Sequence, residues 1–122
     1  MKKRAVLLIF LVFLALQAGC TSDQTLVDQI REKGKLTVVT RNSGTTYYQG
    51  PFGDTGLEYE LSKQFAEHLG VELRVIVEEN FSRMFKLLES GKVDIAAANL
   101  SITDSRKKYL QFGPAYVPLI TP

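Results

Sequence analysis

The sequence predicts an α/β protein in which helices pack on a parallel sheet. Three apolar segments, over residues 36–40, 71–77 and 93–98, have the character of buried strands. Two segments between them, over residues 57–69 and 81–88, carry apolar residues at helical spacing. The order strand, helix, strand, helix, strand requires crossover connections, which are right-handed in parallel sheets. Ligands of such sheets bind outside the carboxyl ends of the strands.

The first predicted elements are a short helix and a strand. Apolar residues between Leu26 and Ile30 stand at helical spacing, and Gly34 is expected to end the helix. Residues 36–40 follow as a β-branched run that is typical of a buried strand. Residues 41–54 contain three glycines and a proline, so we expect a loop there.

The most regular helix is predicted over residues 57–69. Thr55 and Glu58 have the spacing of a capping box, in which each side chain satisfies a backbone N–H group of the other. Gly70 is expected to stop the helix. Apolar residues recur every four positions and form one stripe, which consists of Leu57, Leu61, Phe65 and Leu69.

The second half of the chain repeats the alternation. Residues 71–77 predict a strand, and Asn80 can cap a helix over residues 81–88. Four apolar residues of this helix are expected at helical spacing toward the core, namely Phe81, Met84, Phe85 and Leu88. Residues 93–98 predict a short third strand, and Thr103 is expected to cap a last short helix through Tyr109.

The N-terminus has the organisation of an export signal. Three basic residues after Met1 are followed by an unbroken apolar run over residues 5–16, which is too short to span a bilayer. Gly19-Cys20 then resembles a bacterial lipobox, in which the cysteine carries the lipid, although Gln17 stands where the lipobox usually has Leu. The alternative is a plain signal peptide with an incidental cysteine. Lipidation is favoured because a lone thiol in an exported chain lacks a disulfide partner.

These features predict three parts of the chain and a location. Residues 1–19 are the expected lipoprotein signal peptide, residues 20–25 a tether, and residues 26–122 the folded domain. Thr21 is not the Asp that tends to retain such lipoproteins at the inner membrane. We therefore expect a periplasmic protein that a lipid on Cys20 anchors to the outer membrane.

The charge balance excludes a nucleic-acid partner. The whole chain has 15 basic and 13 acidic residues, and removal of the three basic residues at positions 2–4 leaves 12 against 13. The net charge of the mature part is therefore about −1. No basic stripe interleaved with aromatic residues is present. The roughly 100 mature residues suit one small domain.

Residues 99–106 are the strongest candidate for ligand binding. They follow a predicted buried strand and open a helix, so their N–H groups and hydroxyls can point toward an anion. Arg106 can hold a carboxylate through two parallel hydrogen bonds. The same pattern fits an ordinary helix start that Thr103 caps, with a solvated Arg106. The residues alone leave both interpretations open.

Two stretches resemble solute-binding protein family 3, whose members bind polar amino acids outside the cytoplasm. Residues 100–116 resemble that family's T-x-x-R…F-s-x-P-Y segment, and residues 55–69 resemble its G-F-D-v-D-L helix. The similarity extends over about residues 30–116. It implies the first lobe of a type II periplasmic-binding-protein fold, with the second lobe missing from this chain. It also implies that Arg106 holds a ligand carboxylate with help from Ser101 and Asn99.

A narrower resemblance links the chain to the front of the membrane-bound lytic murein transglycosylase F family. Residues 32–43, 46–47 and 56–61 carry it. That family joins a solute-binding domain to a C-terminal domain that cleaves peptidoglycan with a catalytic Glu. These 122 residues contain no counterpart of the catalytic domain, so we assign no catalytic residue and expect no glycan cleavage by this chain alone.

The loop after the first strand departs from the pattern of amino-acid transporters. Such binders often have an Asp there for the ligand ammonium and an aromatic residue soon after, whereas this chain has Arg41 and Gly44 near those places. A cation at that point repels an ammonium group. The departure favours the transglycosylase-type lobe.

Other polar and aromatic residues carry weaker predictions. Tyr47 is a candidate for lining the ligand cleft, and packing on its own lobe is an equal alternative. His68 is the single histidine and cannot assemble a zinc site without further ligands, so we expect neither a metal nor a cofactor.

These observations leave three functional hypotheses. The favoured one is the sensor lobe of a transglycosylase-F-like lipoprotein, which recognises a small carboxylated ligand such as an amino acid or a peptidoglycan peptide. The alternative is the amino-acid-binding protein of an ABC transporter. The third is a truncated product without a function. The gene beyond Pro122 distinguishes them, because a second lobe with a lysozyme-like domain, a second lobe alone, or an immediate stop each point to one hypothesis.

Overall fold

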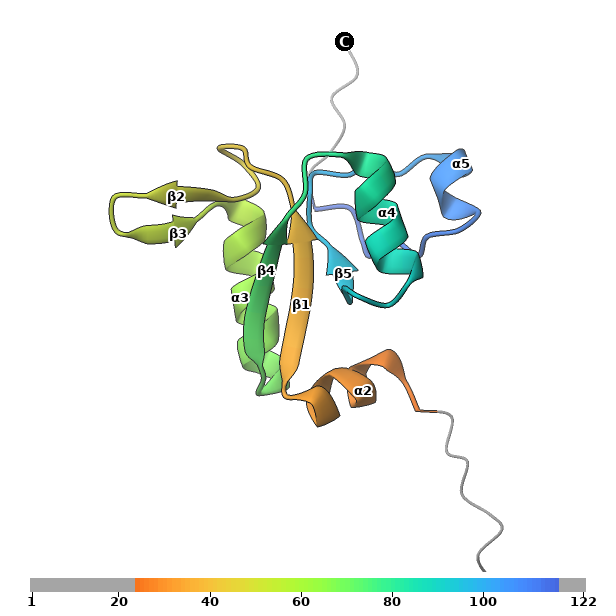
Figure 1. Ribbon diagram of the computed structural model, residues 1–122, viewed down its shortest axis with the longest axis horizontal. Helices are drawn as coiled ribbons and strands as arrows, with labels where there is room; N and C mark the ends of the chain where they lie inside the picture. Colours follow the sequence, from red (N-terminus) through yellow and green to blue (C-terminus); the bar gives the residue numbers. More distant parts are fainter. Residues whose placement is uncertain (1–23, 117–122) are drawn as a thin grey trace, which may run out of the picture.

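The computed structural model describes residues 24–116. Three strands form a parallel sheet in the order β4-β1-β5, and β2 and β3 form a separate antiparallel pair. This arrangement confirms the predicted α/β fold with a parallel sheet (Figure 1). In chain order the elements are α2 (Leu26–Lys33), β1 (Lys35–Thr40), β2 (Tyr48–Gly50), β3 (Gly53–Thr55), α3 (Leu57–Leu69), β4 (Glu72–Val77), α4 (Phe81–Glu89), β5 (Ile95–Ala96) and α5 (Asp104–Lys107).

The central strand β1 has core residues on both of its faces. Leu36 and Val38 belong to one core cluster, together with Ile30 of α2 and with Ala66 and Leu69 of α3. Val39 belongs to a second cluster on the α4 side, which also contains Met84, Val93 and Ala98. Figure 1 shows α3 behind the sheet and α4 in front of it. The continuous β-branched run of β1 is thus explained, because a parallel strand covered on both faces has no solvent side.

Helix ends follow the predicted cap residues at α4 and α5. Asn80 accepts a hydrogen bond from the N–H of Arg83, and Thr103 accepts one from the N–H of Arg106. Met84 of α4 is completely buried, whereas Phe81 and Phe85 are half-buried. The prediction that all three belong to the core is therefore correct for Met84 and incomplete for the two aromatic residues.

Two predicted segments differ in detail. Residues 41–54 are not an irregular loop throughout, because β2 and β3 pair as a hairpin that extends away from the sheet (Figure 1). The third strand is limited to Ile95–Ala96 instead of residues 93–98. Only these two residues pair with β1, and three residues later the chain turns at Asn99, whose φ of 51° lies in the left-handed region.

The predicted capping box at the start of α3 is wrong. Gly56 is the N-cap residue, and no side chain caps this helix. Glu58 instead points inward and is 4 % exposed. The apolar stripe is also less buried than its spacing suggests, since Leu57, Leu61 and Phe65 are 38–51 % exposed. Helix α3 therefore packs on the sheet through Ala66 and Leu69. Its buried face is rotated away from Leu57, Leu61 and Phe65.

Within residues 24–116, no helix is long and apolar enough to cross a membrane. The predicted signal peptide, its apolar run and Cys20 lie outside the described residues.

Candidate ligand-binding site

Three connections meet at the carboxyl end of the parallel sheet, opposite α2 (Figure 1). Residue 41 follows β1, residues 78–80 follow β4, and residues 97–103 lead from β5 to α5. Crossover connections of a parallel sheet bring these segments together although they are far apart in the sequence. The candidate residues from 99–106 therefore lie beside residues of two other connections.

Arg106 lies on α5 and faces two aromatic rings. Its Nη1 donates a hydrogen bond to the backbone carbonyl of Ser101 at 2.9 Å. Its guanidinium carbon lies 5.7 Å from the ring centroid of Phe81 and 5.8 Å from that of Phe85, which is within cation–π range. Among the described residues the guanidinium makes this one hydrogen bond, so most of its five N–H groups are available to an anion.

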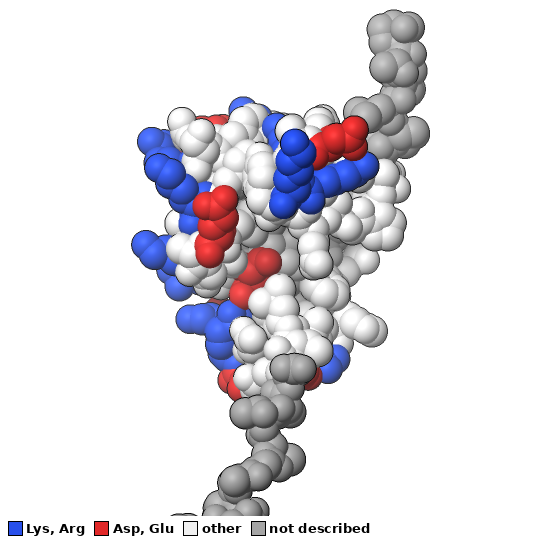
Figure 2. Space-filling model, turned by 90° about the vertical axis from the view of Figure 1, so that its right-hand side faces the viewer, with Lys and Arg blue, Asp and Glu red and all other residues white. Residues whose placement is uncertain are grey.

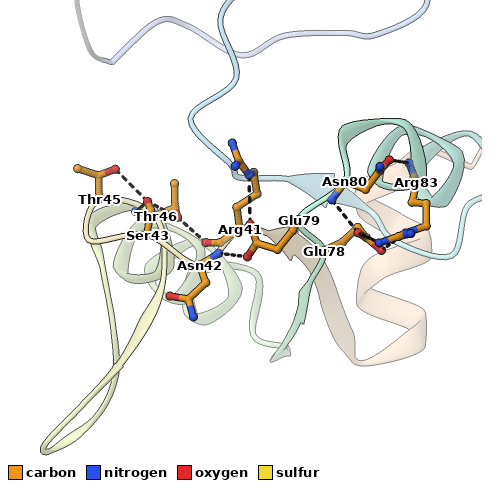
Figure 3. Close-up of polar contacts among 9 residues, drawn as sticks. All are labelled: Arg41, Asn42, Ser43, Thr45, Thr46, Glu78, Glu79, Asn80 and Arg83. Carbon is orange, nitrogen blue, oxygen red and sulfur yellow. Dashed lines mark hydrogen bonds and ion pairs between the residues drawn. The ribbon is translucent and has the colours of Figure 1, made fainter.

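Arg41 approaches the same Phe81 ring from the β1 connection. Its guanidinium carbon is 4.6 Å from the ring centroid. Its Nε lies 3.5 Å from Oε2 of Glu79 and has no hydrogen-bond partner within the described part of the chain. Figure 3 shows Glu79 between Arg41 and the backbone N–H of Asn42, which donates to the other carboxyl oxygen at 2.8 Å.

Glu58 anchors the segment that carries the candidate residues. The backbone N–H of Asn99 donates to both of its carboxyl oxygens, at 2.8 and 2.9 Å. The hydroxyl of Tyr116 donates to the same carboxyl group. Burial and the Glu58 carboxyl raise the pKa of Tyr116 well above its usual range. Helix α3 thus fixes both ends of the segment from residue 99 to residue 116.

The other face of that segment lines an apolar groove. The groove has a volume of about 960 Å³ and runs between α3, β5 and residues 109–116. Figure 2 shows uncharged side chains over much of this side of the molecule, next to a half where charged residues gather. The apolar lining of the groove includes Leu61, Phe65, Leu88, Tyr109 and Phe112. Neither Arg41 nor Arg106 lines this groove.

The structure brings together three of the four predicted binding residues. Asn99 and Ser101 lie on the connection from β5 to α5 and Arg106 lies on α5 directly after it, whereas Tyr47 packs elsewhere. The hydroxyl of Tyr47 donates to Asp54 at 3.0 Å, and its ring meets that of Tyr59 edge-on at 5.8 Å. Burial and Asp54 raise the pKa of Tyr47. No described contact joins Tyr47 to the other three residues.

The sequence pattern did not indicate the roles of Phe81 and Glu58. Phe81 looked like a core residue because it begins the apolar pattern of α4. The missed signal is its position directly after the Asn80 cap, which places it at the carboxyl end of β4. Glu58 gave no separate signal, because its spacing to Thr55 matched a local cap. Within residues 24–116, no group of three His, Cys, Asp or Glu side chains is placed to hold a metal ion.

Comparison with known proteins defines the class of this protein. The sequence model of bacterial extracellular solute-binding proteins, family 3, matches residues 28–121. The chain belongs to this family, and its structural neighbours identify the fold as the first lobe of a type II periplasmic binding protein. One neighbour is the arginine-bound form of domain 1 from ArgBP of T. maritima, with a TM-score of 0.67 and 28 % identity over 73 % of this chain and 71 % of that one.

A second structural neighbour is an ancestral cationic amino acid solute-binding protein. Its TM-score is 0.63, with 29 % identity over 69 % of this chain and 37 % of that one.

Two curated relatives carry the name of one enzyme. Membrane-bound lytic murein transglycosylase F 1 of Alkalilimnicola ehrlichii is 45 % identical over 92 residues, which are 75 % of this chain and 19 % of that protein. Membrane-bound lytic murein transglycosylase F of Pseudoalteromonas translucida is 38 % identical over 116 residues, 95 % of this chain and 25 % of that protein. The chain is thus similar to one end of these relatives and spans about a fifth to a quarter of their length.

Proposed function

We propose that this chain is the ligand-binding lobe of a transglycosylase-F-like lipoprotein, and that it recognises a small carboxylated ligand. The single observation that carries the proposal is Arg106, whose guanidinium is held over two aromatic rings by the Ser101 carbonyl with most of its donors unused. A guanidinium fixed in this way can bind a carboxylate through two charge-assisted hydrogen bonds. Ser101 and Asn99 lie on the connection that precedes it.

The relatives support a role in peptidoglycan turnover. The chain would bind an amino acid or a peptidoglycan-derived peptide and couple that binding to a glycan-cleaving domain. The names of its transglycosylase relatives support this role. The family description and those names favour a periplasmic location. Attachment through a lipid on Cys20, and the outer membrane as its place, are part of this proposal.

The alternative function is an amino-acid-binding protein of an ABC transporter. Structural neighbours described as arginine-bound or as binders of cationic amino acids favour it. Arg41 argues against it, because a second guanidinium at this edge repels the cationic end of such a ligand.

Ligand titration tests the role of Arg106. The full chain in a mild detergent is labelled with ¹⁵N and titrated with N-acetyl-L-glutamine, which carries one carboxylate and no cation. A single lobe leaves half of the ligand in water, where an ion pair contributes at most about 1 kcal/mol, so we expect millimolar affinity. Amide shifts should be concentrated in residues 99–106 and should weaken in Arg106→Gln.

The matched control is Arg31→Gln, which removes an exposed guanidinium from α2 at the opposite end of the sheet. This control should bind as the wild type does. Equal affinities of wild type and Arg106→Gln would show that Arg106 is merely a solvated helix residue.

Mass spectrometry of the exported protein tests the anchor. We expect a mature N-terminus at Cys20 that carries lipid. Cleavage elsewhere, or an unmodified Cys20, contradicts this part of the proposal.

Incubation of the chain with purified peptidoglycan tests the absence of enzyme activity. We expect no release of anhydro-muropeptides. The acidic residues that line the groove are Glu58, Glu89 and Asp94, and two of them are engaged within the lobe, since Glu58 accepts hydrogen bonds from Asn99 and Tyr116 and Asp94 pairs with Lys33. Among the described lining residues no pair of carboxyl groups is therefore free for glycan cleavage. Release of such products would contradict the expectation.

A further inference from the structure

We infer that Arg41 and Arg106 act together and make this site selective for ligands with two anionic groups. The inference rests on the proposed function, because it takes Arg106 as the first anion contact. It adds Arg41 as a residue that determines specificity.

The geometry places both guanidinium groups around one ring. Arg41 comes from the β1 connection and Arg106 from α5, and their guanidinium carbons lie 4.6 and 5.7 Å from the centroid of Phe81. These two distances place the guanidinium carbons within about 10 Å of each other, a span that the two carboxylates of a glutamate-sized ligand can bridge. Phe81 attracts each of them through its ring face, which holds two like charges near each other in the absence of a ligand.

The acidic residues nearby do not neutralise both cations. Glu78 is engaged by Arg83, whose Nε and Nη2 donate to its two carboxyl oxygens at 2.9 Å. Asp104 pairs with Lys107 at 3.2 Å. Glu79 faces Arg41, but their side chains are 55 % and 38 % exposed and the Nε of Arg41 has no hydrogen-bond partner among the described residues. Exposed pairs of this kind are weak.

An arriving ligand can therefore use Arg41 as well as Arg106. A ligand with one carboxylate satisfies one guanidinium, and Arg41 then keeps only its exposed pair with Glu79. A ligand with two carboxylates satisfies both, whereas a cationic ligand is repelled by both. The preferred ligand class is a small dicarboxylate or an acidic peptide.

The test compares two ligands of the same shape. N-acetyl-L-glutamate and N-acetyl-L-glutamine differ by one carboxylate, and L-arginine serves as the cationic probe. Each is titrated into the ¹⁵N-labelled full chain and into Arg41→Gln, Arg41→Lys, Arg106→Gln and the control Arg31→Gln. Dispersed amide spectra verify that each variant is folded.

We expect the wild type to bind the glutamate compound about two- to fivefold more tightly than the glutamine compound, and L-arginine more weakly than either. Arg41→Gln should bring the ratio of the two affinities to about one. Arg41→Lys, which keeps the charge, should retain most of the preference, and Arg31→Gln should retain all of it. Higher salt should reduce the preference, because screening weakens exposed ion pairs.

The experiment distinguishes a failure of the inference about Arg41 from a failure of the proposed function. Equal affinities for the two N-acetyl compounds in the wild type, or a preference that survives Arg41→Gln, overturn the inference about Arg41. If Arg106→Gln still weakens both compounds, the proposed function stands. If neither compound shifts the spectrum, the proposed function is overturned, and the inference falls with it.

Discussion

Helices α2 and α3 are each preceded by a threonine with an acidic residue three positions later. At α2 the pattern forms a complete capping box, in which Asp28 accepts from the N–H of Thr25 at 3.2 Å and Thr25 accepts from the N–H of Asp28 at 3.2 Å. At α3 the same spacing forms no cap, and Glu58 binds the N–H of Asn99, 41 residues away. One sequence pattern therefore has a local use in one helix and a tertiary use in the other.

The first N–H groups of α3 show why the two outcomes differ. Tyr59 donates to the carbonyl of Thr46 at 3.0 Å, and Glu58 donates to the carbonyl of Thr45 at 3.4 Å. The connection from β1 to β2 thus supplies the acceptors that a capping side chain normally supplies. Because the helix start is already satisfied, the carboxyl group of Glu58 is free to turn inward. A cap pattern therefore forms a cap only where no other acceptor reaches the helix start.

The largest effect is expected from Gly56→Ala, because the added methyl group would push the β1–β2 connection away from the start of α3. Gly56 has a φ of 132°, and an added Cβ would collide with the Thr46 carbonyl group and lie 2.9 Å from the backbone nitrogen of Tyr47. We expect a loss of about 3 kcal/mol in the free energy of unfolding, measured by denaturant titration with circular dichroism. Gly44→Ala is the control, because a Cβ there meets nothing within 4 Å. A loss below about 1 kcal/mol would show that the contact is loose.

Glu58→Ala should have the next largest effect. It leaves the Asn99 N–H and the Tyr116 hydroxyl without their acceptor, which costs about 2–3 kcal/mol in unfolding free energy. Glu58→Gln keeps an acceptor oxygen and should recover at least half of the loss. If Glu58→Ala is as stable as Thr55→Ala, Glu58 is not the tertiary anchor that the comparison requires.

Tyr116→Phe removes one of the two groups that Glu58 holds. We expect a loss of about 1 kcal/mol, because one hydrogen bond is lost and the carboxyl keeps the Asn99 N–H. The folded-state pKa of Tyr116 is raised, so its contribution is complete below about pH 10, where an unfolded tyrosine ionises, and declines above it. The stability difference from Tyr116→Phe should therefore shrink above pH 10. A difference that is constant with pH contradicts the contact.

Thr25→Ala and Thr55→Ala compare the two threonines directly and should give the smallest effects. The first removes a capping hydroxyl and should cost about 1 kcal/mol in unfolding free energy. The second removes a hydroxyl that caps nothing and should cost less than about 0.5 kcal/mol. Equal losses would mean that Thr55 caps α3 in solution.

Much of the fold was predictable because its signals are local. The Asn80 and Thr103 caps and the glycines that end α2 and α3 depend on neighbouring residues, and all four occur where expected. The strand run of β1 was equally clear, because both of its faces are buried. The hairpin β2–β3 was missed because its glycines and proline match an irregular loop as well as a turn.

The candidate site was predictable in part. Arg106, Ser101 and Asn99 lie on one continuous segment, so a sequence motif could identify them together. The approach of Arg41 and Arg106 to Phe81 could not be predicted, because Arg41 follows β1, Phe81 begins α4 and Arg106 lies on α5, far apart in the sequence. Tyr47 was selected from its loop position, and the structure places it against Tyr59 and Asp54 instead of beside Arg106.

The order of helices and strands, most of their ends and the segment on which Arg106 lies follow from the sequence alone. These features depend on side-chain periodicity and on hydrogen bonds within a few residues. Tertiary structure decided which carboxyl group is a cap and which is an anchor, and which arginines share a ring. The physical reason is that a buried polar group binds the donor that folding brings within about 3 Å, and that donor can belong to any part of the chain.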